Sequence, residues 1–282
     1  MRVHLCGVRG SIPAVGSEFA GVGGDTSCVA VAHDGESSPR LLLDAGTGLR
    51  RVSTLLGDQP FRGAILLGHL HWDHTYGLPF FRAGDRTGAK VTLYVPEQGV
   101  PAVELISRFM SPPAFPILPT ELQGDWTFES IDEGSHEIAG FDVLAREIPH
   151  KGGRTFGYRV SDGHSSLVYM SDHGPAGALG PGSDGLGPYH DAAMELCTGV
   201  DLLIHDAQHT AEELPARAAY GHSAGEYAVE LARRAGAARV LLFHHDPTRT
   251  DDGVAAIESE LQKITDVVVE AAREGVTIAL PA

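Results

Sequence analysis

The segment GHLHWDHTYG, residues 68–77, gathers four potential metal ligands within six positions: His69, His71, Asp73 and His74. The apolar run AILLG at 64–68 leads into them and predicts a strand buried on both faces. The ligands therefore follow the point where a strand ends. Histidine combined with carboxylate suits zinc, iron or manganese. In a turn, His69 and His71 can point toward one ion while Asp73 and His74 reach another, so the segment predicts a site for two ions.

Short apolar runs alternate with glycine-rich turns along the whole chain. Several runs are continuously apolar, which is typical of strands that helices cover on both faces. The predicted strands are 3–8, 27–32, 41–44, 64–68, 91–95, 156–160, 166–170, 201–205, 240–243 and 276–280. The pattern predicts an α/β protein.

Two helices are indicated near the C-terminal end of the chain. Residues 223–236 carry a capping box of Ser223 and Glu226, with Gly236 in the position of a C-terminal cap. Residues 250–274 carry apolar side chains at helical spacing, at Val254, Ile257, Leu261, Ile264 and Val268. Two segments rich in glycine and proline, 111–119 and 174–188, predict irregular loops that can form the rim of a pocket.

Composition excludes several classes of protein. The chain has 282 residues, which we interpret as one domain over 1–282, and a net charge of −16, which disfavours a long nucleic acid as partner. No apolar run has the length of a membrane span or the form of a signal peptide. The three cysteines lack the spacing of a disulfide framework or a thiolate zinc site. We therefore expect a cytoplasmic protein with no membrane partner.

The motif HLHWDH resembles the metallo-β-lactamase superfamily. That resemblance implies a four-layer αβ/βα sandwich, with two mixed β-sheets flanked by helices and a dinuclear metal site between them. It assigns three further ligands to His150 in EIPHKGG, Asp172 in LVYMSDHG and His244 in VLLFHHDP. By this resemblance His69, His71 and His150 hold one ion, Asp73, His74 and His244 hold the second, and Asp172 bridges them. Zinc is the first choice of metal, manganese and iron are alternatives, and His245 competes with His244.

The segments GGDTSCVAV and LLLDAGTG also match the superfamily and place Asp44 near the ligand loop. Asp44 can accept the free ring N–H of a ligand histidine or form an Asx-turn at the strand end, and both interpretations stay open.

The segments LLIHDAQHT and YGHSAGEYAVELARRAGAARVLLFHH resemble the ribonuclease Z and cyclic phosphodiesterase branch of the superfamily. The resemblance gives His222, beside a helix N-terminus, the task of stabilising charge or protonating the leaving oxygen. Asp206 then holds the tautomer of His222, and Asp73 orients the nucleophile. His205 and His209 have no matching role, so we expect them to be structural or exposed.

The interval between His150 and Asp172 is only 22 positions, too short for the basic arm of ribonuclease Z. With the acidic net charge, this favours a small phosphodiester, such as a cyclic one, cleaved by a metal-bridging hydroxide. Phe109 and Phe115 can stack on a base or cover the core, and a homodimer is possible. A carbonyl hydrolase acting on a lactam, lactone or thioester is the alternative, and a non-catalytic metal-binding sensor is a weaker one.

Overall fold

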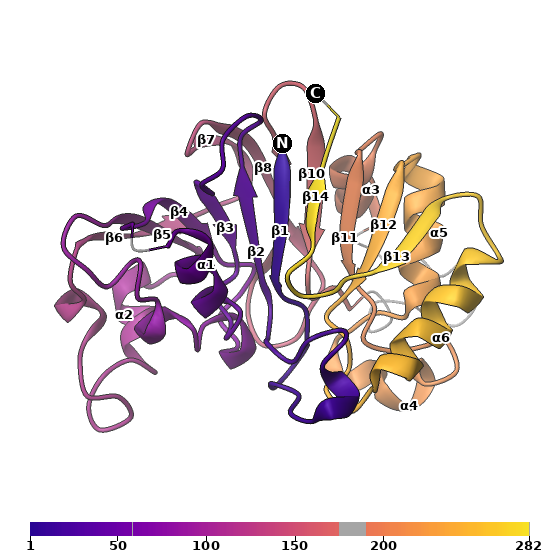
Figure 1. Cartoon of the computed structure of the whole chain (residues 1–282), viewed down its shortest axis with the longest axis horizontal. Coiled ribbons are helices and arrows are strands. Elements are labelled where there is room, and N and C mark those ends of the chain that lie inside the picture. Colours follow the sequence, from indigo (N-terminus) through magenta and orange to yellow (C-terminus); the bar gives the residue numbers. More distant parts are fainter. Residues whose placement is uncertain (58, 175–189, 282) are drawn as a thin grey trace.

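The computed structural model describes residues 1–57, 59–174 and 190–281. In this part of the chain, two seven-stranded sheets lie face to face (Figure 1). The first has the order β14 (Thr277–Ala279), β1 (Arg2–Gly7), β2 (Cys28–Ala32), β3 (Leu41–Leu43), β4 (Arg62–Leu66), β5 (Lys90–Pro96), β6 (Asp125–Ile131). The second has the order β13 (Val268–Ala271), β12 (Arg239–Phe243), β11 (Leu202–Asp206), β10 (Ser166–Met170), β9 (Thr155–Ser161), β8 (Phe141–Ile148), β7 (Gly134–Ile138).

Both sheets are mixed. Strands β3 to β6 are parallel in the first sheet and β10 to β13 are parallel in the second, while the remaining neighbours are antiparallel. The last strand, β14, pairs with β1, so the two ends of the chain meet in the first sheet, as Figure 1 shows.

Helices cover the outer face of each sheet. The helices are α1 (Leu49–Leu55), α2 (Ala102–Ser107), α3 (His190–Cys197), α4 (Leu214–Arg217), α5 (Gly225–Ala235) and α6 (Asp251–Gln262), with short 3-10 turns at Ser17–Phe19, Trp72–His74, Leu78–Phe80, Pro119–Glu121 and Ala218–Tyr220. Helices α1 and α2 pack on the first sheet, and α3, α5 and α6 pack on the second. One apolar core, which includes Val3, Tyr158 and Phe243, fills the space between the sheets. The four-layer sandwich expected from the sequence is therefore confirmed.

Three strands, β6 to β8, lie in a stretch for which no strand is predicted. Strand β6 reads DWTFESI and exposes most of its residues, and β7 is similar. These segments are too polar for the continuous apolar runs used to find strands. Strands β6 and β7 form because an edge strand buries little of its surface and gains its stability from pairing with one neighbour. Strand β8 is not an edge strand, because it pairs with both β7 and β9.

The predicted helix at 250–274 is wrong in its second half. Helix α6 ends at Gln262, and Val268–Ala271 forms β13, which pairs in parallel with β12. The Thr265 hydroxyl accepts a hydrogen bond from the Val267 N–H and turns the chain between them. Val267, Val268 and Val269 are β-branched, and such residues favour a strand. The helical spacing of apolar residues beyond Gln262 is a coincidence and does not reflect a continued helix.

The predicted capping box is also wrong. Helix α5 begins after Ala224, the Ser223 hydroxyl donates to the His173 carbonyl, and the Glu226 carboxylate accepts from the Ala211 N–H. Both side chains therefore bond to residues outside the helix and do not cap its N-terminus. Gly236 does end α5 in the left-handed region, with φ of 66°, as predicted.

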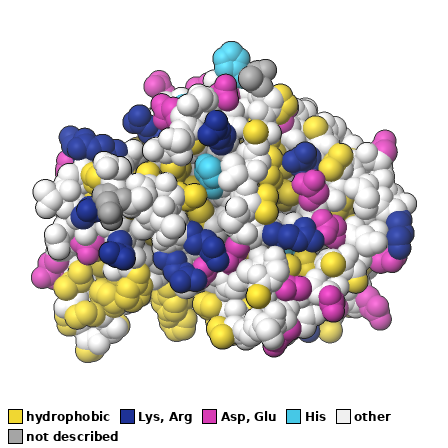
Figure 2. Space-filling view, viewed as in Figure 1, with side chains coloured by type: hydrophobic (Ala, Val, Ile, Leu, Met, Phe, Trp, Pro, Cys, Tyr) yellow, Lys and Arg dark blue, Asp and Glu magenta, His cyan; other side chains and the backbone are white. Residues whose placement is uncertain are grey.

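The two predicted loops have different outcomes. Segment 111–119 is irregular as expected and ends at the 3-10 turn Pro119–Glu121. Figure 2 shows apolar side chains gathered at the α2 end of the molecule. All but one of the residues of the other predicted loop, 174–188, lie outside the described residues.

None of the described helices combines the length and the apolar character needed to span a bilayer.

Candidate metal centre

The predicted ligands come from four strand ends that meet at one edge of the sandwich. Strand β4 of the first sheet ends at Leu66, just before His69. Strands β8, β10 and β12 of the second sheet end two residues or fewer before His150, Asp172 and His244. Because the strand ends face one another across the core, residues more than 170 positions apart become neighbours. The tertiary fold, and not local sequence, assembles the cluster.

The first group of potential ligands is His69, His71, His150 and Asp172, whose ligand atoms all lie within 4.8 Å of one another. The Nε2 atom of His150 lies 3.3 Å from Nδ1 of His71 and 3.6 Å from Oδ1 of Asp172. The Nε2 atom of His69 lies 3.8 Å from the same oxygen. Three imidazoles thus surround one carboxylate oxygen.

The second group is Asp73, His74, Asp172 and His244. Nε2 of His74 lies 3.1 Å from Asp73 Oδ2 and 3.0 Å from Asp172 Oδ2. Nε2 of His244 lies 3.0 Å from Asp73 Oδ2 and 3.4 Å from Asp172 Oδ2. Asp172 belongs to both groups and presents a different oxygen to each, which is the arrangement expected of a bridging carboxylate.

His245 does not join the cluster. Its Nε2 atom lies 3.0 Å from the Ala272 carbonyl, on the far side of β12, while its backbone pairs with Arg9. His244 has a left-handed backbone, with φ of 57°, which turns its ring toward Asp73. The two adjacent histidines therefore point in different directions, and His244 is the one at the site.

Several buried nitrogen and oxygen atoms of the cluster lack a hydrogen-bond partner, which fits a site for divalent cations. Within the described residues, both ring nitrogens of His69, Nε2 of His74, Oδ2 of Asp172 and Nδ1 of His244 are buried and make no well-directed hydrogen bond, although His74 Nε2 and Asp172 Oδ2 lie 3.0 Å apart. Leaving a polar atom buried without a partner costs about 1–3 kcal/mol. A bound cation would satisfy several of these atoms at once, and neutral imidazole with carboxylate is the donor set that zinc and related metals take.

The electrostatics of the cluster hold His69 and Asp172 in metal-binding protonation states. Burial, reinforced by the neighbouring His74, holds the pKa of His69 well below its usual value, so its ring stays neutral. Burial opposes the ionisation of Asp172, but His244 and His74 outweigh it and hold the pKa of that carboxyl well below its usual range. Neutral imidazole and ionised carboxylate are the forms that bind metal.

Asp206 and His222 lie together beside the cluster, as predicted. Nδ1 of His222 donates to Oδ2 of Asp206 at 2.9 Å, and the same nitrogen lies 3.6 Å from Oδ1 of Asp172. Burial opposes the charged ring, but Asp206 outweighs burial and raises the pKa of His222 to about 9. The sequence also predicted that His222 lies beside free N–H groups at the start of a helix. The first N–H of α5, at Gly225, is not free, because it donates to the His209 carbonyl.

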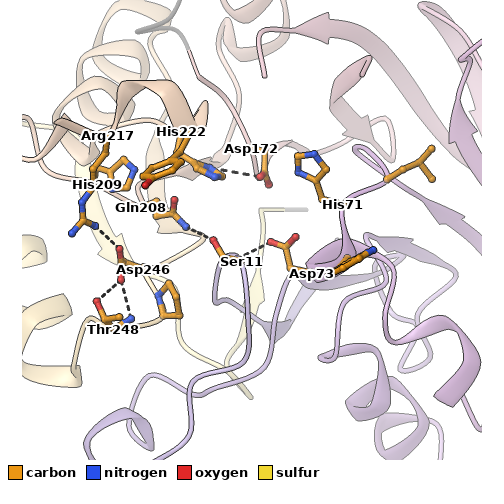
Figure 3. Close-up of a pocket in the computed structure, with 14 residues that line it drawn as sticks. Ser11, His71, Asp73, Asp172, Gln208, His209, Arg217, His222, Asp246 and Thr248 are labelled. Atoms are coloured by element: carbon orange, nitrogen blue, oxygen red, sulfur yellow. Dashed lines mark hydrogen bonds and ion pairs between the residues drawn. The ribbon is translucent and has the colours of Figure 1, made fainter. Parts of the chain in front are cut away.

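A cavity of about 630 Å³ opens onto this cluster (Figure 3). Predicted residues in its wall are His71, Asp73, Asp172 and His222. Residues that the sequence did not indicate are Ser11, Leu70, Trp72, Gln208, His209, Arg217, Tyr220, Asp246, Pro247 and Thr248. Trp72 had a signal in the sequence, since it lies between two predicted ligands. Leu70 lies between His69 and His71, and five others lie in segments quoted for the resemblance: Gln208, His209, Tyr220, Asp246 and Pro247. Ser11, Arg217 and Thr248 lie outside these segments and reach the cavity only through the fold.

Ser11 supports the cluster from the first sheet's opening loop. Its backbone N–H donates to Asp73 Oδ2 at 2.8 Å, and its hydroxyl accepts from Nε2 of Gln208 at 3.0 Å. Its φ is 62°, an uncommon conformation for serine, and such backbone strain is often found at functional sites. Ser11 thereby holds the Asp73 carboxylate in place.

For two further histidines and two phenylalanines the sequence left two alternatives each, and the structure favours one of each pair. His205 and His209 are both buried, His205 against His173 at 2.9 Å and His209 in the cavity wall, so neither is exposed. Phe109 and Phe115 are partly buried against the core on the outer face of the first sheet. Covering the core is therefore their role, and neither lines the 630 Å³ cavity.

The sandwich and its cluster of histidines and aspartates define a metal-dependent hydrolase. Residues 39–245 match the model of the β-lactamase superfamily domain, and the chain belongs to that family. A curated ribonuclease Z from Lacticaseibacillus casei (strain BL23) is 28% identical over 256 residues, covering 79% of this chain and 80% of that protein.

Two solved structures show the same fold. YhfI from Bacillus subtilis, a metallo-β-lactamase fold protein, has a TM-score of 0.72 at 18% identity and covers 99% of each chain. The short form of human tRNase Z has a TM-score of 0.68 at 21% identity, with full coverage of both chains. The family that the sequence motifs suggested is confirmed, and the curated relatives named ribonuclease Z bear out the resemblance to that branch.

Proposed function

We propose that this protein is a metal-dependent phosphodiesterase that acts on a small phosphodiester, such as a cyclic one. The observation that carries the proposal is the pair His222–Asp206 beside the two ligand groups, with His222 in the wall of the cavity that opens onto them. The curated relatives named ribonuclease Z support the choice of a phosphodiester as the bond cleaved.

Two divalent ions, with zinc as the first choice, would be held by the two groups described above, with Asp172 shared between them. When bound, such ions supply a water of lowered pKa and a Lewis acid for a phosphoryl oxygen.

Asp73 has a positioning role at the nucleophile side of the site. Its Oδ2 atom accepts the Ser11 N–H at 2.8 Å and lies 3.0 Å from His244 Nε2, so its carboxylate is held in one orientation. A fixed carboxylate can accept a hydrogen bond from the attacking water and aim that water at phosphorus.

His222 acts at the leaving-group side. Because its Nδ1–H is donated to Asp206, Nε2 is the ring nitrogen left for the substrate, and the ring lines the cavity. As water adds to phosphorus and the P–O ester bond breaks, Nε2 of His222 delivers a proton to the departing oxygen. The products are a phosphomonoester and a hydroxyl group, which in a cyclic substrate remain on one molecule.

Three observations support a small substrate. The cavity, at about 630 Å³, lies in the range for small-molecule sites. The net charge of −16 opposes long polyanions. The 22 positions between His150 and Asp172 leave no room for a long RNA-binding arm there.

The test is an assay of purified protein of known metal content. The substrates are bis(p-nitrophenyl) phosphate, 2′,3′- and 3′,5′-cyclic nucleotides, a precursor tRNA, a lactam and a lactone. We expect diester cleavage, which falls about 10²–10⁴-fold in His222→Ala with metal content retained. His164→Ala, which removes an exposed histidine, is the matched control and should match the wild type. Cleavage of the carbonyl substrates alone would overturn the proposal.

A further inference from the structure

An exposed aromatic pair borders the cavity. Trp72 is 63% exposed and Tyr76 is 43% exposed, yet their rings are stacked, with centroids 5.4 Å apart and planes 17° from parallel. The Tyr76 N–H donates to the Trp72 carbonyl at 2.8 Å, so a backbone turn sets the spacing of the pair. Tyr76 therefore holds the indole in one orientation although the indole is not part of a core.

Trp72 is placed directly beside the proposed reaction centre. In the sequence it lies between His71, which belongs to the first ligand group, and Asp73, which belongs to the second. Its side chain lines the cavity onto which the cluster opens and also a second cavity of about 450 Å³ that is lined by His69 and Phe109. A group attached to a phosphate at the cluster can therefore reach the indole.

The wall contributed by the second half of the chain carries hydrogen-bonding groups. Arg217 pairs with Asp246 at 2.7 Å, and the Thr248 hydroxyl donates to Asp246 at 2.6 Å. Figure 3 shows these three side chains across the cavity from His71 and Asp73. Tyr220, which is 64% exposed, lines the same cavity. Aromatic faces combined with fixed donors and acceptors suit a flat heterocycle with polar edges better than an alkyl chain.

We infer that the phosphodiester carries a nucleobase and that the base stacks on the indole of Trp72. This inference rests on the proposed function and names the substrate class for that same site. Stacking explains why a large aromatic side chain is rigid and exposed beside a buried polar cluster. Every nucleobase has a π face, and one stacked base contributes about 1–3 kcal/mol to binding.

A fluorescence titration tests the stacking without depending on turnover. The chain has two tryptophans, and Trp126, whose Nε1–H donates to the Gly84 carbonyl at 3.0 Å, lines neither of the two cavities. The variant Trp126→Phe leaves Trp72 as the sole reporter in the metal-loaded protein. We expect saturable quenching by adenosine 5′-monophosphate and none by ribose 5-phosphate. Equal responses to the two ligands, or none to either, would overturn the inference.

Kinetics with paired substrates tests the same contact. Adenosine 2′,3′-cyclic phosphate carries a base, and glycerol 1,2-cyclic phosphate does not. Trp72→Leu should lower kcat/KM for the first at least about fivefold more than for the second. Phe80→Leu is the matched control, because Phe80 is 64% exposed but does not line the cavity. An equal loss on both diesters in Trp72→Leu would contradict base stacking.

The two tests separate the inference from the proposed function. Quenching by adenosine 5′-monophosphate without hydrolysis of either diester would support the base site and contradict the phosphodiesterase assignment. Hydrolysis of both diesters without quenching would support the phosphodiesterase and overturn the base site.

Discussion

The Nδ1 atom of His74 lies 2.6 Å from Oδ2 of Asp44, and both side chains are fully buried. Asp44 also accepts hydrogen bonds from the Gly68 N–H, the Tyr169 hydroxyl and the Ser171 hydroxyl. It thus accepts four hydrogen bonds, one of which fixes the His74 ring so that Nε2 faces Asp73 and Asp172. Of the two roles left open by the sequence, orientation of a histidine is the one that the geometry supports.

Replacing Asp44 with Asn should weaken metal binding. Asparagine tolerates the left-handed backbone at this position, where φ is 60°, so the fold should be kept. The loss of the charged acceptor for His74 should lower metal affinity about 10–100-fold, measured by chelator competition. Asp142→Asn, at an exposed position of β8, is the control. Unchanged affinity in Asp44→Asn would show that Asp44 does not act through His74.

Single-ligand variants should remove metal selectively. Of the two groups that share Asp172, His71 belongs only to the first and His244 only to the second. Each alanine variant should therefore lose about one ion per chain, whereas Asp172→Ala should lose both. Metal analysis after dialysis measures this, and exposed His164→Ala is the control. Chelation of wild-type protein should lower the melting temperature, because each ion at 100 times its Kd stabilises the fold by about 2.7 kcal/mol. Full metal content in Asp172→Ala would refute the shared-ligand arrangement.

Asp206 and His222 should behave as one unit in catalysis. Asp206→Asn removes the carboxylate that holds Nδ1–H of His222, and His222→Ala removes the proton donor itself. Because one acts through the other, the double variant should be no slower than His222→Ala alone. Steady-state kinetics of the four proteins at equal metal content measures the coupling. Multiplicative losses would mean that Asp206 acts independently.

Glu274 should make stability depend on pH. Its side chain is 4% exposed, and burial, with a further contribution from the Asp25 carboxylate, raises its pKa to about 7 despite the ion pair with Arg51. Between pH 4.5 and 7 the folded state therefore binds more protons than the unfolded state, so stability falls as pH rises. Relative to Glu274→Gln, the wild type should lose on the order of 2 kcal/mol across this range in urea unfolding. Parallel pH profiles for the two proteins would contradict this.

Arg9 should be essential for stability although it lies outside the cluster. Its guanidinium is fully buried and donates to the carbonyls of Gly23, Asp246 and Arg249 at 2.7–3.2 Å. Arg9→Met leaves these acceptors without their donor and should cost about 3 kcal/mol in denaturant unfolding. Exposed Arg40→Met should cost less than about 1 kcal/mol. A small loss in Arg9→Met would mean that water replaces the guanidinium.

Sequence reasoning was most reliable where the signal is local. The apolar runs before His69, Asp172 and His244 identified buried strands, because a strand covered on both faces reads as a continuous apolar run. It failed at β13, where β-branched residues at helical spacing follow α6, and pairing with β12 decides the outcome. Edge strands β6 and β7 were missed because their polar faces resemble loops.

The sequence by itself determined the class of the fold and the order of the ligands, since strand hydrophobicity and the spacing of His69, His71, Asp73 and His74 are local properties. Only the tertiary structure chose His244 over His245, because the left-handed turn at the end of β12 sends adjacent side chains to opposite sides. Only the packing of the two sheets brought Ser11, Trp72 and Arg217 into one cavity. No spacing rule relates these residues, because their separation is set by the docking of strand ends across a shared core.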